Sequence, residues 1–202
     1  MQSAGRHLAP ERIILKKDMR NRIEKAVKVL REGGLVVIPT ETVYGICADP
    51  FNREAVDRIY KLKERDERKP LQLLIHDKGT AAKLATGLNR NTNKFLDENW
   101  PGPLTVILKK KRTVPNYITG GLKSVGLRVP DHPVALEIIR RFGPVAATSA
   151  NISGKDPAIT VAQAKKNLPK GIDLFIDGGK CKIGISSKVI RIKNGKIDVI
   201  RK

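Results

Sequence analysis

Three groups of polar residues in this chain have types and spacing that could do chemistry. The first is a loop directly after an apolar run, in which Thr40, Glu41, Thr42 and Tyr44 fall within five residues. The other two are a pair of cations and a short turn, and their candidate residues are Lys63 and Arg65, and Thr148, Ser149 and Asn151. Hydroxyl, amide and cationic groups donate hydrogen bonds to carboxylate and phosphate oxygens, so the pattern indicates binding of an anionic ligand.

Each group also has a structural interpretation, and the residues alone leave both open. Threonine hydroxyls in a loop often satisfy their own backbone. Lys63 and Arg65 come at the end of a predicted helix, where cations offset the negative helix terminus by about 0.3 to 1 kcal/mol. In the functional interpretation the same cations pair with phosphate through stronger, charge-assisted contacts.

Several common kinds of site are not indicated. Residues 179–184 have the glycine spacing of a P-loop, but Ile185 and Ser186 follow where that motif requires lysine and then serine or threonine. No Gly-x-Gly-x-x-Gly follows an expected strand, so a Rossmann cofactor has no fingerprint. The histidines are scattered and the two cysteines cannot close a zinc site, so we expect no resident metal and no catalytic triad.

The charge balance is the most informative total. Lysine and arginine number 40 against 20 acidic residues, which gives a formal net charge of +20 in 202 residues. Because the basic residues are spread along the chain, they predict a folded basic face and an anionic partner, from nucleotides to RNA. Solubility alone is the alternative explanation, and the eight aromatic residues are few for stacking bases.

The composition predicts a cytoplasmic protein. No apolar run approaches the ~20 residues of a membrane span. Residues 1–10 lack the apolar core of a secretory signal and are expected to form a short mobile tail. Cys47 and Cys181 lie far apart in the sequence, so no disulfide framework is predicted and a reducing compartment fits.

Apolar periodicity predicts helices that alternate with strands. The clearest helix is opened by Asp18 or Asn21 and stopped by Gly33-Gly34, and the strand 35–38 follows and ends at Pro39. Asn52 should cap a second helix. Further helices are expected at 80–86, 91–99, from Asp131 to Gly143, and from Thr160, in a capping box with Gln163, to Leu168 before the stop at Pro169 and Gly171. Further strands are expected at 11–17, 71–75, 104–108, 125–129, 145–148 and 174–176.

The chain should close with a hairpin, since apolar runs at 189–192 and 197–200 flank Asn194-Gly195. Residues 117–123 contain two glycines and could form a mobile lid. Arg128 lies inside an otherwise apolar strand, where a charge is costly to bury. These elements predict one α/β domain over residues 11–202, with a twisted open mixed sheet and helices on its faces.

Five motifs in order resemble the YrdC family. They are Pro39-Thr40-Glu41-Thr42-Val43-Tyr44-Gly45, Lys63-Glu64-Arg65 with Lys69-Pro70-Leu71, Pro101-Gly102-Pro103-Leu104-Thr105, Val125-Gly126-Leu127-Arg128-Val129-Pro130 and Ser149-Ala150-Asn151-Ile152-Ser153-Gly154. The likeness runs over nearly the whole chain and matches the family's free-standing form. It implies a basic concave face and a threonylcarbamoyl-AMP synthase, which makes L-threonylcarbamoyladenylate and pyrophosphate from L-threonine, bicarbonate and ATP for N6-threonylcarbamoyladenosine in tRNA.

The resemblance also implies roles for individual residues. Lys63 and Arg65 would be the catalytic cations on the ATP phosphates, with Ser149, Asn151 and Ser124 also at the nucleotide. Thr40, Thr42, Tyr44 and Arg128 would hold threonine, the arginine by a fork on its carboxylate. Thr148 and Ser187 are further candidates at the same site. Mg2+ is expected with ATP, and weak binding of tRNA and a downstream tRNA threonylcarbamoyltransferase are the expected partners.

Two positions depart from the family pattern. The chain has Ser187-Lys188-Val189 where relatives often have Ser-Thr-Val, and Leu73 and Leu74 where several relatives have a histidine. The first change removes a hydroxyl, and the second leaves open what the substrate side of that strand presents.

Two other functions remain as alternatives. A non-catalytic protein of the same fold that binds double-stranded RNA or tRNA would also explain the net charge of +20. A domain that transfers carbamoyl groups from carbamoyl phosphate, as in hydrogenase maturation, is less consistent with the length of this chain because such domains usually occur within much larger proteins.

Overall fold

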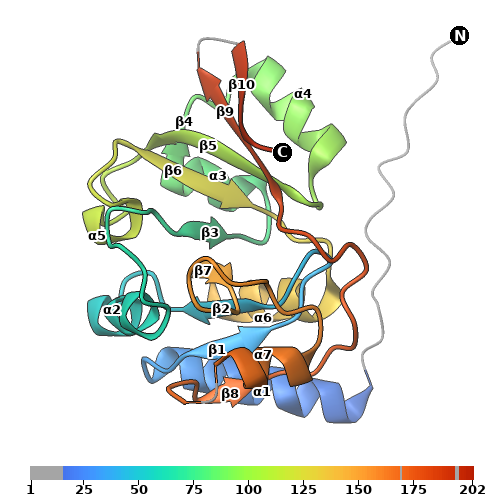
Figure 1. Ribbon diagram of the computed structural model, residues 1–202. Coiled ribbons are helices and arrows are strands. Elements are labelled where there is room, and N and C mark those ends of the chain that lie inside the picture. Colours follow the sequence, from blue (N-terminus) through green and yellow to red (C-terminus); the bar gives the residue numbers. More distant parts are fainter. Residues whose placement is uncertain (1–15, 169, 194–195) are drawn as a thin grey trace, which may run out of the picture.

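A mixed sheet in the order β10-β9-β5-β6-β3-β7-β2-β1-β8 runs through the protein, with β4 paired to β5 beside it (Figure 1). The structure is a computed structural model that describes residues 16–168, 170–193 and 196–202. The expected N-terminal tail, residues 11–15 of the strand predicted at 11–17, Pro169 and the Asn194-Gly195 turn lie outside the described residues. The end of that predicted strand is wrong, because Lys17 begins a helix. Within the described residues, no helix is long and apolar enough to cross a membrane.

The strands are β1 Val36–Ile38, β2 Gly45–Ala48, β3 Gln72–Leu74, β4 Ala85–Thr86, β5 Leu104–Lys110, β6 Ser124–Arg128, β7 Val145–Ser149, β8 Leu174–Phe175, β9 Lys188–Lys193 and β10 Lys196–Arg201. The helices are α1 Lys17–Arg31, α2 Arg53–Leu62, α3 Lys78–Leu84, α4 Arg90–Asn99, α5 Asn116–Thr119, α6 Pro133–Phe142 and α7 Val161–Asn167. The pairs β1·β8, β3·β6 and β5·β9 are parallel and the others antiparallel, which confirms the predicted mixed sheet.

Helices pack on both faces of this sheet. On one face, α1 and α6 bury an apolar cluster with β1, β2, β3 and β7. On the other face, a larger cluster joins α2, α3, α4 and α7 to the sheet. Val36 and Val37 enter different clusters because successive strand side chains point to opposite faces. The strand register places Gln72 beside Ala147 and Gly126, so the α1/α6 face continues past these helices as one wall of a cleft.

Glycines at the end of α1 determine where β1, the strand that leads to this cleft, begins. Gly33 has φ 77°, and its N–H and that of Gly34 bond back to the carbonyls of Leu30 and Val29, which ends α1 as predicted. The buried strand β1 then begins directly at Val36. Asn52 caps α2 by accepting a hydrogen bond from the N–H of Ala55, as predicted.

Several predicted details are wrong. Neither Asp18 nor Asn21 caps α1, whose N-cap is Lys16, and α6 is preceded by His132 rather than capped by Asp131. Residues 85–86 leave α3 to pair with β5 because Lys109 and Lys110 extend that strand.

Residues 117–123 also differ from the predicted lid, because α5 buries Ile118 there and the N–H of Leu71 bonds to its carbonyl. Thr160 caps α7 as predicted, yet Gln163 accepts from the N–H of Ile159 and so does not complete a capping box.

Candidate active site

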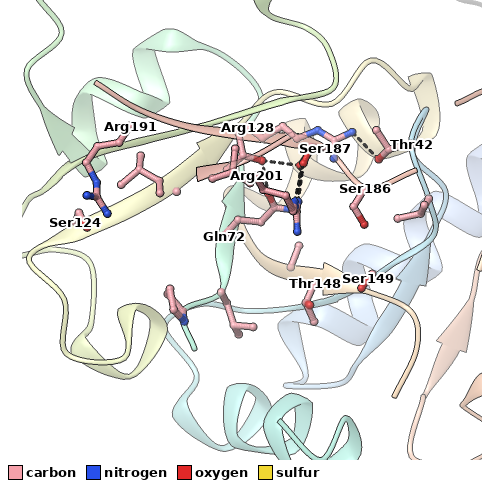
Figure 2. Close-up of a pocket in the computed structure, with 18 of the residues that line it drawn as sticks. Thr42, Gln72, Ser124, Arg128, Thr148, Ser149, Ser186, Ser187, Arg191 and Arg201 are labelled. Carbon is pink, nitrogen blue, oxygen red and sulfur yellow. Dashed lines mark hydrogen bonds between the residues drawn. The ribbon is translucent and has the colours of Figure 1, made fainter. Parts of the chain in front are cut away.

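A cleft of about 230 Å³ opens where β3, β5, β6, β7 and β9 meet the loop after β1. Figure 2 shows its polar lining, with Arg128, Ser187, Arg201 and Gln72 gathered together and Thr148 and Ser149 across from them. Of the predicted site residues, the cleft brings together Thr42, Arg65, Ser124, Arg128, Thr148, Ser149 and Ser187. Thr40, Tyr44, Lys63 and Asn151 do not line it.

Arg128 is a buried cation at the centre of this lining. Its side chain is 3% exposed, and its Nη2 lies 2.7 Å from Oε1 of Glu41 in an ion pair. The same nitrogen donates to Oγ1 of Thr42 at 2.9 Å, and Nε donates to the carbonyl of Gly102 at 3.1 Å. Among the described residues, neither carboxylate oxygen of Glu41 accepts a hydrogen bond, so its contact with Arg128 is an ion pair alone. The charge expected to be costly in this strand is therefore balanced by a second buried charge.

The loop after β1 places its two threonines differently. Thr40 is buried and accepts from the N–H groups of Thr42 and Val43, while its own hydroxyl donates to the carbonyl of Val43 at 2.6 Å. Thr40 thus forms the turn, and Thr42, which reaches Arg128, faces the cleft. In this hydroxyl-rich loop the structural interpretation therefore applies to Thr40, and the functional one to Thr42.

Tyr44 connects this loop to a distant segment. Its hydroxyl donates to the carbonyl of Gly179 at 2.7 Å and accepts from the N–H of Gly178 at 3.2 Å. Burial is the main cause that raises the pKa of Tyr44 to about 12. The ring is fully buried, so Tyr44 holds the 177–187 segment, which carries Ser186 and Ser187, against the cleft.

The C-terminus of α2 turns sharply toward the cleft. Glu64 has φ 51°, and the N–H of Arg65 reaches back to the carbonyl of Tyr60. A left-handed residue at this position closes a helix, although glycine is the usual choice. Arg65 then bonds to the carbonyls of Lys69 and Pro70 at 3.3 and 3.0 Å, with its side chain in the cleft lining.

Lys63 lies at the C-terminal end of α2, as predicted, but it is buried there instead of facing solvent. It is 1% exposed, and its Nζ donates to the main-chain carbonyls of Ser149 and Asn151. Desolvation, aided by the charge of Arg65, lowers the pKa of Lys63 to about 7. The sequence could not reveal this because the carbonyls belong to a turn 86 and 88 residues away.

In the 149–151 turn, Ser149 lines the cleft, whereas Asn151 forms hydrogen bonds within its own loop. Thr148 and Ser149 are half-buried and line the cleft. Asn151 is buried, and its amide group donates to the carbonyls of Ile152 and Lys155, while its Oδ1 has no hydrogen-bond partner among the residues that the structure describes.

Sequence reasoning missed Arg201, which comes from the last strand. The β9·β10 ladder is regular to Val199 and then shifts, so that Arg201 rather than Ile200 lies opposite Val189, a cleft residue. Such a bulge re-aims a side chain. Arg201 thereby donates to the carbonyl of Ser187 at 3.0 and 2.6 Å. No local sequence signal marks this bulge.

Ser187 belongs to a short hydrogen-bonded chain that was also missed. Its hydroxyl lies 2.9 Å from that of Thr105, which donates to Oε1 of Gln72 at 2.6 Å. The sequence did mark Gln72 as a candidate, because it is a polar residue within an otherwise apolar strand, as Arg128 is. It supplies the cleft side of β3, whereas Leu73 and Leu74 are core residues and Lys188 is exposed.

The cleft has a strongly positive lining. Burial lowers the pKa of Arg201, and the charges of Arg128 and Arg65 lower it further, so the three guanidinium groups share one field. Arg191 adds a fourth cation. No aspartate or glutamate is among the described residues that line the cleft. Such a lining favours a ligand with several negative charges.

Known proteins share this fold and sequence. The Sua5/YciO/YrdC family model, described as telomere recombination, matches residues 28–202. Threonylcarbamoyl-AMP synthase of Pyrococcus abyssi is 40% identical over 179 residues, which cover 86% of this chain and 53% of that protein. The synthase of Halorhodospira halophila is 34% identical over 176 residues, which cover 87% of this chain and 91% of that protein.

A solved structure agrees with these matches. The crystal structure of P. abyssi Sua5 complexed with L-threonine has a TM-score of 0.85 and 38% sequence identity, over 89% of this chain and 53% of that one. Our chain thus spans about half the length of the Pyrococcus protein and most of the Halorhodospira one. By its sequence and its fold, the chain belongs to the Sua5/YciO/YrdC family.

Proposed function

We propose that this protein is a threonylcarbamoyl-AMP synthase that acts as a nucleotidyltransferase. The observation that carries the proposal is the convergence of Arg65, Arg128 and Arg201 on a cleft whose described lining has no carboxylate. A triphosphate and an amino-acid carboxylate are anions that such a lining can hold together. The synthase names of relatives that match most of this chain support the same reaction.

The reaction needs no nucleophile from the protein. The amine of L-threonine adds to CO2 derived from bicarbonate and loses a proton, which gives a carbamate. A carbamate oxygen then attacks the α-phosphorus of ATP, the bond to the β-phosphate oxygen breaks, and pyrophosphate leaves. The protein's contribution is to position the reactants and to stabilise the charge that develops on phosphate.

The two substrates divide the cleft in this proposal. Arg128 and Thr42 receive the carboxylate of threonine, because they lie together in the cleft lining and Glu41, which is outside that lining, fixes the guanidinium. ATP lies toward Arg65, Ser124, Ser149 and Arg201, which line the remainder. Thr148 and Ser187 stay candidates for contacts with either substrate.

Mg2+ enters this proposal as a counterion of the ATP phosphates. Within the described residues there is no cluster of histidine, cysteine or acidic side chains that could hold a metal ion, and the cleft lining offers cations instead of carboxylates. The residues present therefore do not fit a resident Mg2+ site, and no step is assigned to the ion.

The decisive experiment is to incubate the purified protein with L-threonine, bicarbonate, Mg2+ and ATP. We expect pyrophosphate together with a threonylcarbamoyl adenylate, identified by mass and by label from 14C-bicarbonate. Omission of threonine or of bicarbonate should abolish both products. Pyrophosphate release that continues without threonine would instead indicate an ATP pyrophosphatase, and the proposal would be wrong.

RNA binding is a second candidate function, favoured by the net charge of +20. We propose weak, sequence-independent binding of tRNA or double-stranded RNA, with a downstream threonylcarbamoyltransferase in the cytoplasm as the acceptor of the product. Affinity for RNA should fall steeply between about 50 and 200 mM salt, because phosphate contacts release counterions. Filter binding over that range measures the slope, and a flat curve would exclude a phosphate-based interface.

A further inference from the structure

Lys63 makes its contacts behind the cleft wall. Its Nζ donates to the carbonyl of Ser149 at 2.5 Å and to that of Asn151, and its own carbonyl accepts from the N–H of Ser153 at 2.9 Å. These contacts join the C-terminal end of α2 to the 149–151 turn and to Ser153, which follows it. The side chain is 1% exposed and does not line the cleft.

The environment of this lysine is unusual for a buried cation. Lys63 is in none of the ion pairs found within the described residues, and the charged neighbour that acts on it is Arg65, a like charge. A buried charge without a partner of opposite sign is unfavourable unless hydrogen bonds satisfy it. The two carbonyl groups are therefore what keeps the ammonium group in place.

A direct contact with ATP would require Lys63 to give up this arrangement. Its Nζ would have to leave both carbonyls and pass through the wall formed by the turn. The carbonyls of Ser149 and Asn151 would then lose a buried donor, which is costly in itself. Arg65, two residues later, already reaches the cleft from the same helix end.

We propose that Lys63 is a positioning residue, which fixes the 149–151 turn against α2 so that Ser149 faces the nucleotide, and that it does not itself contact ATP. This inference rests on the proposed synthase function. It separates two cations of one short motif, because Arg65 touches the substrate and Lys63 acts through the turn.

A double-mutant cycle tests whether Lys63 acts through the turn. Ser149→Ala should lower kcat/KM for ATP about tenfold in the wild type. In a Lys63→Met background the same change should cost less than about twofold, because the turn has already lost its position and coupled residues are not additive. Lys63→Met keeps an unbranched side chain that is one atom shorter and removes the donors of Nζ. Lys61→Met, an exposed position in the last turn of α2, is the matched control and should leave kcat/KM unchanged.

The outcomes of this cycle separate the two proposals. If the wild type makes no adenylate, the synthase function fails and this inference fails with it. If the wild type is active and Ser149→Ala costs the same factor in both backgrounds, only the positioning role is overturned, because Lys63 then acts independently. An absent effect of Ser149→Ala in the active wild type also overturns it, since the turn would hold nothing that the nucleotide uses.

A measurement on the wild type covers the case in which Lys63→Met does not fold. The pKa of Lys63 is lowered to about 7 by burial and by Arg65, so its 13Cε resonance should titrate near neutral pH. With a non-hydrolysable ATP analogue bound, the pKa should stay well below that of an ordinary lysine if Nζ remains on the two carbonyls. A return to the ordinary range would show that the ammonium group pairs with phosphate, which would overturn the proposal.

Discussion

Arg128 and Arg201 line the same cleft, but Arg128 comes from an interior strand of the sheet and Arg201 from an edge strand. Arg128 belongs to β6, which is paired on both sides, and it is held by the carboxylate of Glu41, the hydroxyl of Thr42 and the carbonyl of Gly102. Arg201 belongs to the edge strand β10, lies at a bulge, and is held mainly by the carbonyl of Ser187. Arg128 is therefore fixed by buried groups, and Arg201 by a contact at the edge of the sheet.

This difference teaches where stability and function are coupled. Arg128 pairs with a buried carboxylate, so its removal leaves Glu41 without the ion pair that it makes among the described residues. Arg201 lies on the more exposed edge strand and bonds to a backbone carbonyl, so its removal leaves no unpaired charge behind. We therefore expect substitutions of Arg128 to disturb folding and substrate binding together, and substitutions of Arg201 to disturb the site alone.

The largest effect should follow removal of the central cation. Arg128→Met should lower the free energy of unfolding by about 3 to 5 kcal/mol, since Glu41 becomes an unpaired buried charge. Urea unfolding followed by circular dichroism measures this loss. Glu41→Gln in the same protein should restore part of it, because the orphaned charge is then gone. A loss that stays below about 1 kcal/mol would show that the pair is solvated and not part of the interior.

The second effect concerns threonine. Arg128→Lys keeps the positive charge but loses the planar fork, so the KM for threonine should rise by roughly 10- to 100-fold, equivalent to about 1.5 to 3 kcal/mol for a hydrogen bond to a charged group. The KM for ATP should change by less than about twofold. Steady-state kinetics with each substrate varied in turn make the comparison. Equal changes in both constants would assign Arg128 to the framework rather than to threonine.

The edge cation should show the opposite separation. Arg201→Met should raise the KM for ATP by about tenfold, close to the 1.4 kcal/mol of one lost charge-assisted contact. Its unfolding free energy should change by less than about 1 kcal/mol. Lys202→Met is the matched control, being the next residue and also exposed, and should alter neither quantity. If Arg201→Met unfolds the protein, Arg201 is needed for stability as well as for the site, and the expected difference from Arg128 is wrong.

The same contrast explains what sequence reasoning could predict. Arg128 was identifiable because a charge within an apolar strand needs a reason, and the predicted strand was correct. Gln72 carried the same kind of signal and was overlooked. Arg201 could not be found, since its direction depends on one extra residue in a ladder between β9 and β10. Alternation predicts which face a side chain takes only while the register is regular.

The fold itself was largely predictable, because periodicity and turn chemistry agreed over most elements. The end of α1 at Gly33, the start of α2 at Asn52 and the mixed sheet were confirmed. Lys63 shows where such reasoning stops, because its burial depends on carbonyls supplied by a remote turn. Sequence pattern shows a cation at a helix end, and only tertiary structure decides whether that cation faces solvent, ligand or backbone.

The smallest effect should come from the anchor of Arg201. Ser187→Ala removes a hydroxyl but keeps the carbonyl that accepts both closer bonds from Arg201, at 3.0 and 2.6 Å, against 3.3 Å for the contact to the hydroxyl. Thr105 loses one neighbour and retains Gln72, so unfolding should become easier by only about 0.5 to 1.5 kcal/mol. The KM for ATP should stay within about twofold of the wild type, and Arg201→Met should keep its tenfold effect when added to Ser187→Ala. If Ser187→Ala alone reproduced that tenfold effect, the hydroxyl would be the true anchor of Arg201, and the edge cation would depend on an interior hydrogen-bond chain much as Arg128 does.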